Sequence, residues 1–168
     1  MDELKYPIGK FVYKADETII NWVEIIHDFP SQLNEVINGM SDQQLDTPYR
    51  PDGWTARQVI HHLADSHCHA LMRFKWTLSE SRPTIKPYLE NEYAKLADYT
   101  LPISSALLIL AGVHEKWHFI LSKMETTDWE KGYDHPQSNK FFTLKEAVSL
   151  YAWHCMHHLG HLKICRSM

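Results

Sequence analysis

The sequence has few cysteines, no long apolar run and no basic leader. Its three cysteines, Cys68, Cys155 and Cys165, are an odd number without a CxxC spacing. This pattern excludes a disulfide scaffold or a cysteine zinc site and predicts a reducing compartment. The longest apolar run, residues 106–113, is too short to span a bilayer. The first residues also lack the basic start and apolar stretch of a secretory signal. We therefore expect a cytoplasmic protein without a membrane partner.

Concentrated charge and the common nucleotide or hydrolase motifs are absent too. The 17 Lys and Arg residues are interleaved with 21 Asp and Glu, giving a net charge of −4. Without a basic run the chain lacks the electrostatic footprint of a nucleic-acid binder. There is no G-x-G-x-x-G, P-loop or G-x-S-x-G sequence. The 168 residues, 44% hydrophobic and 23% charged, predict one globular domain over residues 1–168.

Glycine is scarce, with only six residues, and long stretches have helical periodicity. We expect helices over residues 16–40, 55–79, 104–124 and 143 to nearly the C-terminus, with Pro30 bending or breaking the first. Capping boxes starting at Ser41, Thr55 and Thr143 mark helix starts. Proline, glycine and asparagine content predicts irregular chain over 46–53 and 81–88 and a turn over 134–139. Four long helices in one domain predict an all-α four-helix bundle.

Histidine is the residue in excess, with 12 in the chain, and most are clustered. Residues four apart share a helix face, so His157 and His161 can converge on one metal ion, with a third ligand from the His61–His62 pair on the second helix. Three neutral imidazoles leave coordination positions open, which is typical of a catalytic site. Spacing alone does not select this pair, because His154 and His158 are also four apart on the same arc. Histidines held by carbonyl or carboxylate partners are the alternative without a metal.

A second motif, H-E-x-x-H, occurs at His114, Glu115 and His118, where two histidines would bind zinc and the glutamate would act as base. The motif is short, and no third ligand follows at a familiar spacing. Asp65 and Glu115 could each orient a histidine or act as a base, but solvated carboxylates fit the same pattern. Arg73 lies on the His62 face and could bind an anionic group, with a plain surface role as the alternative.

One long run, Gly53 to His67 (GWTARQVIHHLADSH), resembles the YfiT-type metal-dependent hydrolases of the DinB-like superfamily. Residues 6–9 (YPIG), 45–50 (LDTPYR) and 82–88 (RPTIKPY) are also similar to that family. Residues 153–161 (WHCMHHLGH) resemble its second signature. The resemblance extends over nearly the whole chain, in the same order and spacing.

The resemblance implies an up-and-down four-helix bundle, a homodimer and one divalent metal ion per subunit with water completing its coordination. Matched position by position, the ligands are His62, His157 and His161. It implies a hydrolase acting on a small-molecule substrate, with zinc as the expected metal and nickel as the alternative.

Two other functions are compatible with the same three histidines. Related proteins resemble transferases of a low-molecular-weight thiol, in which the metal would hold the thiolate and Arg73 would pair with an anionic cofactor. The third possibility is a bundle that binds a metal or a small molecule without catalysis. The sequence does not identify the substrate or a general base.

Overall fold

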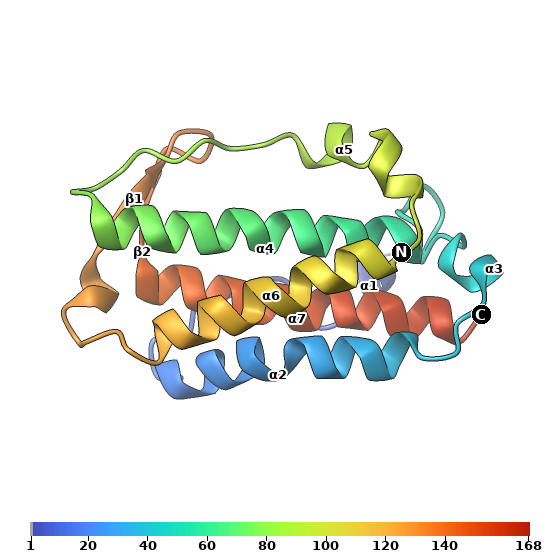
Figure 1. Cartoon of the computed structure of the whole chain (residues 1–168), viewed down its shortest axis with the longest axis horizontal. Helices are drawn as coiled ribbons and strands as arrows, with labels where there is room; N and C mark the ends of the chain where they lie inside the picture. The colour runs from blue at the N-terminus through green and yellow to red at the C-terminus, as the bar shows by residue number, and fades with distance from the viewer. Residues whose placement is uncertain (1) are drawn as a thin grey trace.

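The computed structural model describes residues 2–168 and contains four long helices packed side by side (Figure 1). These are α2 (Ile19–Ile37), α4 (Ala56–Ser79), α6 (Ser104–Leu121) and α7 (Leu144–Arg166). Helices α2 and α4 each pack against both α6 and α7. The predicted all-α four-helix bundle is therefore confirmed.

The direction of the four long helices does not alternate strictly along the chain. In Figure 1, α2 and α7 run one way along the bundle, while α4 and α6 both run the other way. The segment between α4 and α6 returns along the outside of α4 and carries α5 (Glu90–Tyr93) and the 3₁₀ helix η1 (Ala97–Thr100). Consecutive long helices are therefore antiparallel from α2 to α4 and from α6 to α7, whereas α4 and α6 run in the same direction.

Local sequence signals set most of the helix starts. The capping boxes predicted at Ser41, Thr55 and Thr143 are all present, at the N-termini of α3 (Asp42–Leu45), α4 and α7. Each supplies side-chain partners for backbone N–H groups that the first helical turn leaves free.

Helix α2 continues through Pro30, so the break that was one of the two predicted effects of this proline does not occur. Proline has no backbone N–H, so the carbonyl of Ile26, four residues earlier, receives no helical hydrogen bond from it.

A small β-hairpin, which the sequence did not predict, precedes α7. Strand β1 (Gly132–His135) pairs antiparallel with β2 (Lys140–Thr143), and the predicted turn joins them. The 3₁₀ helix η2 (Asp128–Glu130) leads into this hairpin, and the N-terminus carries a short helix, α1 (Asp2–Lys5). Arg82 pairs with Asp134 at 2.8 Å, which fastens the long connection to β1.

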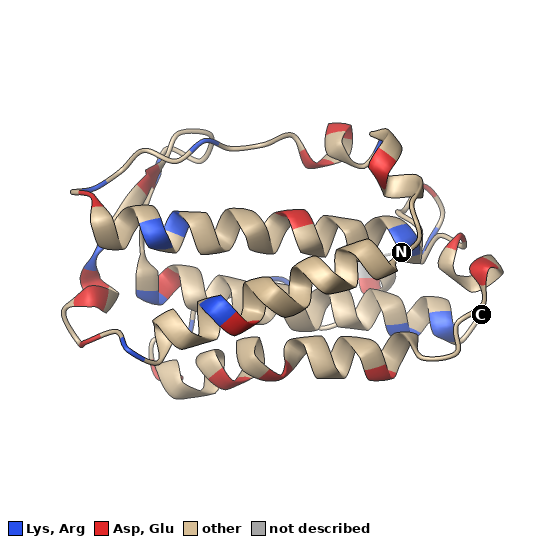
Figure 2. Cartoon of the chain, in the orientation of Figure 1, with Lys and Arg blue, Asp and Glu red and all other residues tan. Residues whose placement is uncertain are grey.

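The hydrophobic core consists of two clusters, one toward each end of the bundle. One surrounds Phe29, Leu63 and Leu159, and the other surrounds Ile26, Phe74 and Trp117. On α4, α6 and α7, His67, His114 and His154 lie in sequence between the residues of the two clusters. Residues of both signs are spread along the bundle, and α2 and α5 carry Asp and Glu without Lys or Arg (Figure 2). Over residues 2–168, no helix is long and apolar enough to cross a membrane.

Candidate metal centre

Five histidines line one cavity of about 350 Å³ between α4, α7 and the N-terminal segment. They are His62, His154, His157, His158 and His161. All three ligands implied by the family resemblance lie here, together with the alternative pair that helical spacing left open. His61, the neighbour of His62, faces away from this cavity, with Nε2 3.2 Å from the carbonyl oxygen of Leu101.

The donor atoms converge on His62 from α7. The Nε2 atoms of His62 and His154 are 3.2 Å apart, and one ligand atom from each of His62, His154 and His158 lies within 4.8 Å of the others. Two imidazoles that share a zinc ion at about 2.0–2.1 Å from each nitrogen stand roughly 3.0–3.4 Å apart. The residues therefore fit a divalent ion.

A second grouping lies one helical turn further along α7. His157, His158 and His161 also have ligand atoms within 4.8 Å of one another. Within residues 2–168, no grouping at this spacing joins His62 with both His157 and His161. His158 thus belongs to both groupings.

Both ring nitrogens of His161, one of the ligands implied by the family resemblance, have hydrogen-bond partners within the protein. His161 places Nε2 3.2 Å from the carbonyl oxygen of Lys5 and Nδ1 3.3 Å from Nδ1 of His158. Because a carbonyl only accepts, Nε2–H of His161 donates to Lys5, and its Nδ1 accepts from His158. The Nε2 lone pair of His158 is then free for a metal. His157 stacks on Trp153 at 4.4 Å between ring centroids, and its buried Nδ1 has no hydrogen-bond partner.

Burial keeps this cluster uncharged at neutral pH. Burial lowers the pKa values of His62, His157 and His161 to about 4. It also lowers the pKa values of His154 and His158 well below the ordinary value for histidine. Neutral imidazoles are the protonation state that binds transition metals, so no proton must be lost before an ion enters.

The H-E-x-x-H residues do not converge. His114 is buried and turns into the core, where its Nδ1 lies 2.6 Å from the carbonyl oxygen of Ile26, while Glu115 is exposed. The His118 ring instead lies against His27, at 4.1 Å between ring centroids and tilted by 33°. In the part of the chain that the structure describes, no metal-ligand grouping contains both His114 and His118. A zinc peptidase site is therefore not formed here.

The carboxylate candidates from the sequence lie outside the histidine cavity. Asp65 accepts a hydrogen bond from the Tyr99 hydroxyl at 2.8 Å, and Glu115 faces solvent. Glu90, on α5, lines the cavity instead. Sequence reasoning missed Glu90, because it belongs to a four-residue helix whose approach to α7 depends on the long return segment.

Arg73 lies in an adjoining cavity of about 250 Å³, which His154 and Glu90 also line. Its Nη1 donates a 2.9 Å hydrogen bond to the Tyr151 hydroxyl, and its buried Nε has no partner. The hydroxyl of Tyr88, on the same cavity wall, is likewise buried without a partner. A positive group with unused hydrogen-bonding capacity therefore lies next to the histidine cavity.

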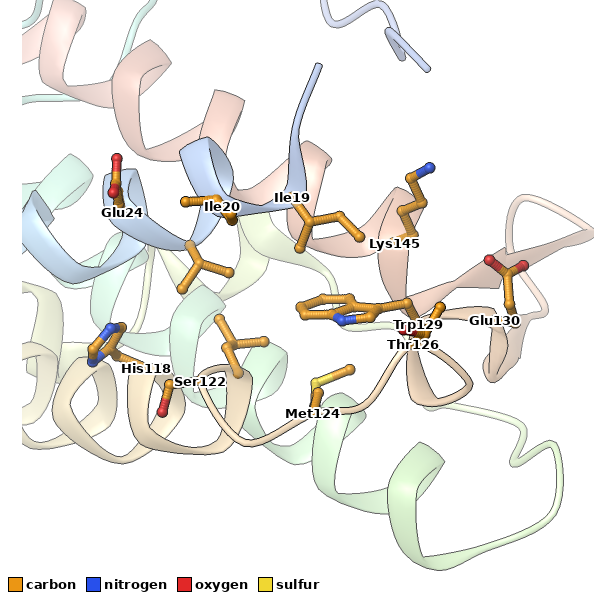
Figure 3. Close-up of a pocket in the computed structure, with 12 residues that line it drawn as sticks. Ile19, Ile20, Glu24, His118, Ser122, Met124, Thr126, Trp129, Glu130 and Lys145 are labelled. Carbon is orange, nitrogen blue, oxygen red and sulfur yellow. The ribbon is translucent and has the colours of Figure 1, made fainter. Parts of the chain in front are cut away.

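A larger cavity of about 580 Å³ lies between α2, the end of α6 and the loop that carries η2. Figure 3 shows Ile19, Met124 and Trp129 pointing into it, with His118 and Glu24 at its side. Only one histidine lines this cavity, so it lacks the ligands that the smaller histidine cavity provides.

Comparison with known proteins identifies the family of this chain. The profile of the DinB superfamily matches residues 26–162. The chain belongs to the DinB superfamily. A Bacillus cereus protein and a Bacillus thuringiensis protein, each named a "putative metal-dependent hydrolase", are 44% identical to it over 99% of this chain and 97% of their own length.

A solved structure is also similar over nearly the whole chain. YfiT from Bacillus subtilis, described as a probable metal-dependent hydrolase with an unusual four-helix bundle topology, superposes with a TM-score of 0.93. It shares 37% identity and covers 97% of this chain and 95% of its own. The predicted family is confirmed, and these relatives together with the histidine groupings indicate a divalent metal.

Proposed function

We propose that this protein is a metal-dependent hydrolase of a small molecule and holds one divalent ion in the histidine cavity. The observation that carries the proposal is the convergence of neutral imidazole nitrogens from α4 and α7 on one solvent-accessible cavity. The names of its relatives support the same reaction class.

We take His62 as the ligand from α4, which the grouping of His62, His154 and His158 includes and the grouping within α7 does not. The family resemblance assigns His157 and His161 as the pair on α7. The short distance between the Nε2 atoms of His62 and His154 favours His154 and His158, and the contact of His161 with the Lys5 carbonyl favours them too. We take zinc as the ion, with nickel as the alternative, because neutral imidazoles suit both metals.

A divalent ion bound here would supply Lewis-acid activation of water and of a substrate carbonyl group. The chain supplies the remaining groups. Glu90 lines both adjoining cavities and is the carboxylate placed to accept a proton. Arg73, with its unused Nε, is placed to bind an anionic part of the substrate. The substrate is therefore proposed to be a small molecule with a hydrolysable carbonyl bond and a negative group. We further propose that the protein acts as a homodimer.

The test is a panel of esters and amides, with and without a carboxylate, assayed with zinc-loaded, nickel-loaded and metal-free protein. We expect metal-dependent hydrolysis that is faster for the anionic members and falls strongly in Glu90→Gln, while exposed Glu115→Gln serves as the matched control. Turnover of a thiol plus an electrophile, without hydrolysis of any panel member, would replace this proposal with the thiol-transferase reading. A metal-loaded protein inactive in both assays would favour non-catalytic binding.

A further inference from the structure

The carbonyl that Pro30 leaves free in α2 has a donor from another helix. Nδ1 of His114, on α6, lies 2.6 Å from the oxygen of Ile26. Both residues are buried, and the His114 side chain is only 2% exposed. A buried carbonyl without a donor costs free energy, so the imidazole supplies the hydrogen bond that proline cannot.

From His114 a row of imidazoles crosses the core to the metal cavity. Nε2 of His114 lies 2.8 Å from Nδ1 of His67, on α4. Nε2 of His67 lies 3.2 Å from Nδ1 of His154, on α7. Nε2 of His154 then faces Nε2 of His62 at 3.2 Å. Every link crosses from one helix to another, the last two both between α4 and α7, and the row begins at a backbone carbonyl.

The carbonyl fixes the direction of every hydrogen bond in this row. Ile26 can only accept, so Nδ1 of His114 carries the proton and donates. A neutral imidazole has one N–H, so Nε2 of His114 must accept from Nδ1–H of His67. By the same reasoning, Nε2 of His67 accepts from Nδ1–H of His154. His154 is left with an unprotonated Nε2 facing the cavity.

We propose that His114 and His67 are positioning residues that use the Ile26 carbonyl to hold His154 in the tautomer whose Nε2 lone pair faces the metal ion. This inference rests on the proposed metal site. Ligating histidines usually donate their second ring N–H to a carbonyl or carboxylate, which fixes the ring and the tautomer. Here two buried imidazoles transmit that function from a carbonyl on the far side of the core.

A separate metal site within the row is the competing interpretation. Ligand atoms of His67, His114 and Cys155 lie within 4.8 Å of one another. However, both nitrogens of His67 and of His114 already have hydrogen-bond partners, and burial raises the pKa of the Cys155 thiol. The Cys155 sulfur is also 4.0 Å from Nε2 of His67, longer than the contact that His154 makes there. The hydrogen-bonded row accounts for every nitrogen without an ion.

The first readout is the tautomer of His154, measured by nitrogen-15 NMR on the full-length, metal-free protein. The proposal predicts a proton on Nδ1 and none on Nε2. In His114→Phe the anchor is lost, His67 is free to protonate Nε2, and a second His154 tautomer protonated on Nε2 is expected. In His114→Gln the amide N–H can donate to Ile26 and the amide oxygen can accept from His67, so the wild-type tautomer should return.

The second readout is zinc affinity, measured by chelator competition. His114→Phe should keep a stoichiometry of one ion but bind it about 10- to 100-fold more weakly, as is usual when a partner beyond the ligands is removed. His114→Gln should recover most of that loss. Phe29→Leu is the matched control, because the Phe29 ring lies against both His67 and His114 at 5.5 and 5.3 Å between centroids and makes no hydrogen bond. It should lower the melting temperature and leave zinc affinity and the His154 tautomer unchanged.

The outcomes separate this inference from the proposed function. Wild-type His154 protonated on Nε2 overturns the inference without any variant having to fold. An unchanged tautomer and unchanged zinc affinity in His114→Phe overturn it as well. If the wild-type protein binds no divalent ion, the proposed function fails, and the metal-positioning role fails with it.

Discussion

The Ile26 carbonyl accepts a hydrogen bond from His114 on another helix and lacks the backbone N–H that residue 30 of its own helix would normally donate. Mutation can remove the first donor and restore the second. Within residues 2–168, His114→Phe removes the one hydrogen bond that this oxygen accepts from outside α2, and it leaves a buried carbonyl to which Pro30 cannot donate. An unsatisfied buried carbonyl costs about 1–3 kcal/mol. His114→Phe also removes the acceptor of His67, which adds a penalty of similar size.

Pro30→Ala restores a backbone N–H that can donate to the same carbonyl within α2. Alone it should cost little or stabilise the protein, because the carbonyl then has two donors for its two lone pairs. Combined with His114→Phe it should recover the Ile26 part of the penalty and leave the His67 part. We therefore expect a coupling free energy of about 1–3 kcal/mol in the double-mutant cycle, equal to the Ile26 part.

Urea unfolding of the four metal-free proteins at neutral pH measures this coupling. Equal m-values across the four would show that the same surface is exposed on unfolding, so that differences in midpoint report stability. Additive effects, within about 0.5 kcal/mol, would refute the account, because the two groups would then not share the Ile26 carbonyl.

Two further predictions concern charge. Arg73→Met should raise KM for substrates that carry a carboxylate by about 10-fold or more while changing kcat/KM for neutral analogues little, because one charged hydrogen bond is worth roughly 1.5–3 kcal/mol; equal losses for both classes would contradict an anion-binding role. The metal-free protein should lose stability as the pH falls from about 6.5 to about 4, because burial lowers the pKa of His62 to about 4 and the unfolded chain therefore takes up its proton first. Each histidine with such a lowered pKa reduces the free energy of unfolding by on the order of 1 kcal/mol for each pH unit of acidification in that window and causes no pH dependence above it. Urea midpoints that rise on acidification would contradict the lowered pKa of His62.

The sequence predicts the helices well because their signals are local. Capping boxes mark the starts of α4 and α7 within a residue, and the spacing of apolar residues predicts a bundle. The hairpin was missed because four-residue strands leave no measurable alternation. The parallel direction of α4 and α6 was missed for a different reason, since it depends on how residues 80–103 return along α4 rather than on any pattern within a helix.

The histidine site could be predicted only in part. Clustering indicated the His61–His62 pair and α7, and the family resemblance selected His62. All four histidines of α7 lie on one arc, so spacing could not separate His157 and His161 from His154 and His158. The hydrogen bond from His114 to the Ile26 carbonyl could not be predicted from the sequence, because it requires α6 to lie beside α2 at the level of Ile26. One signal was available: a proline inside a helix leaves a carbonyl free four residues earlier, and that carbonyl needs a donor.

The central claim is that one divalent ion binds in the histidine cavity with His62 as a ligand. Metal content, measured by plasma mass spectrometry on untagged protein reconstituted with zinc, tests it most directly. We predict about one ion per chain in the wild type and none in His62→Ala. Of the double variants, His154→Ala/His158→Ala should lose the ion if the observed donor geometry selects the pair, and His157→Ala/His161→Ala should lose it if the family resemblance does. A wild-type protein that takes up neither zinc nor nickel, or a His62→Ala variant that keeps the full amount, would contradict the account.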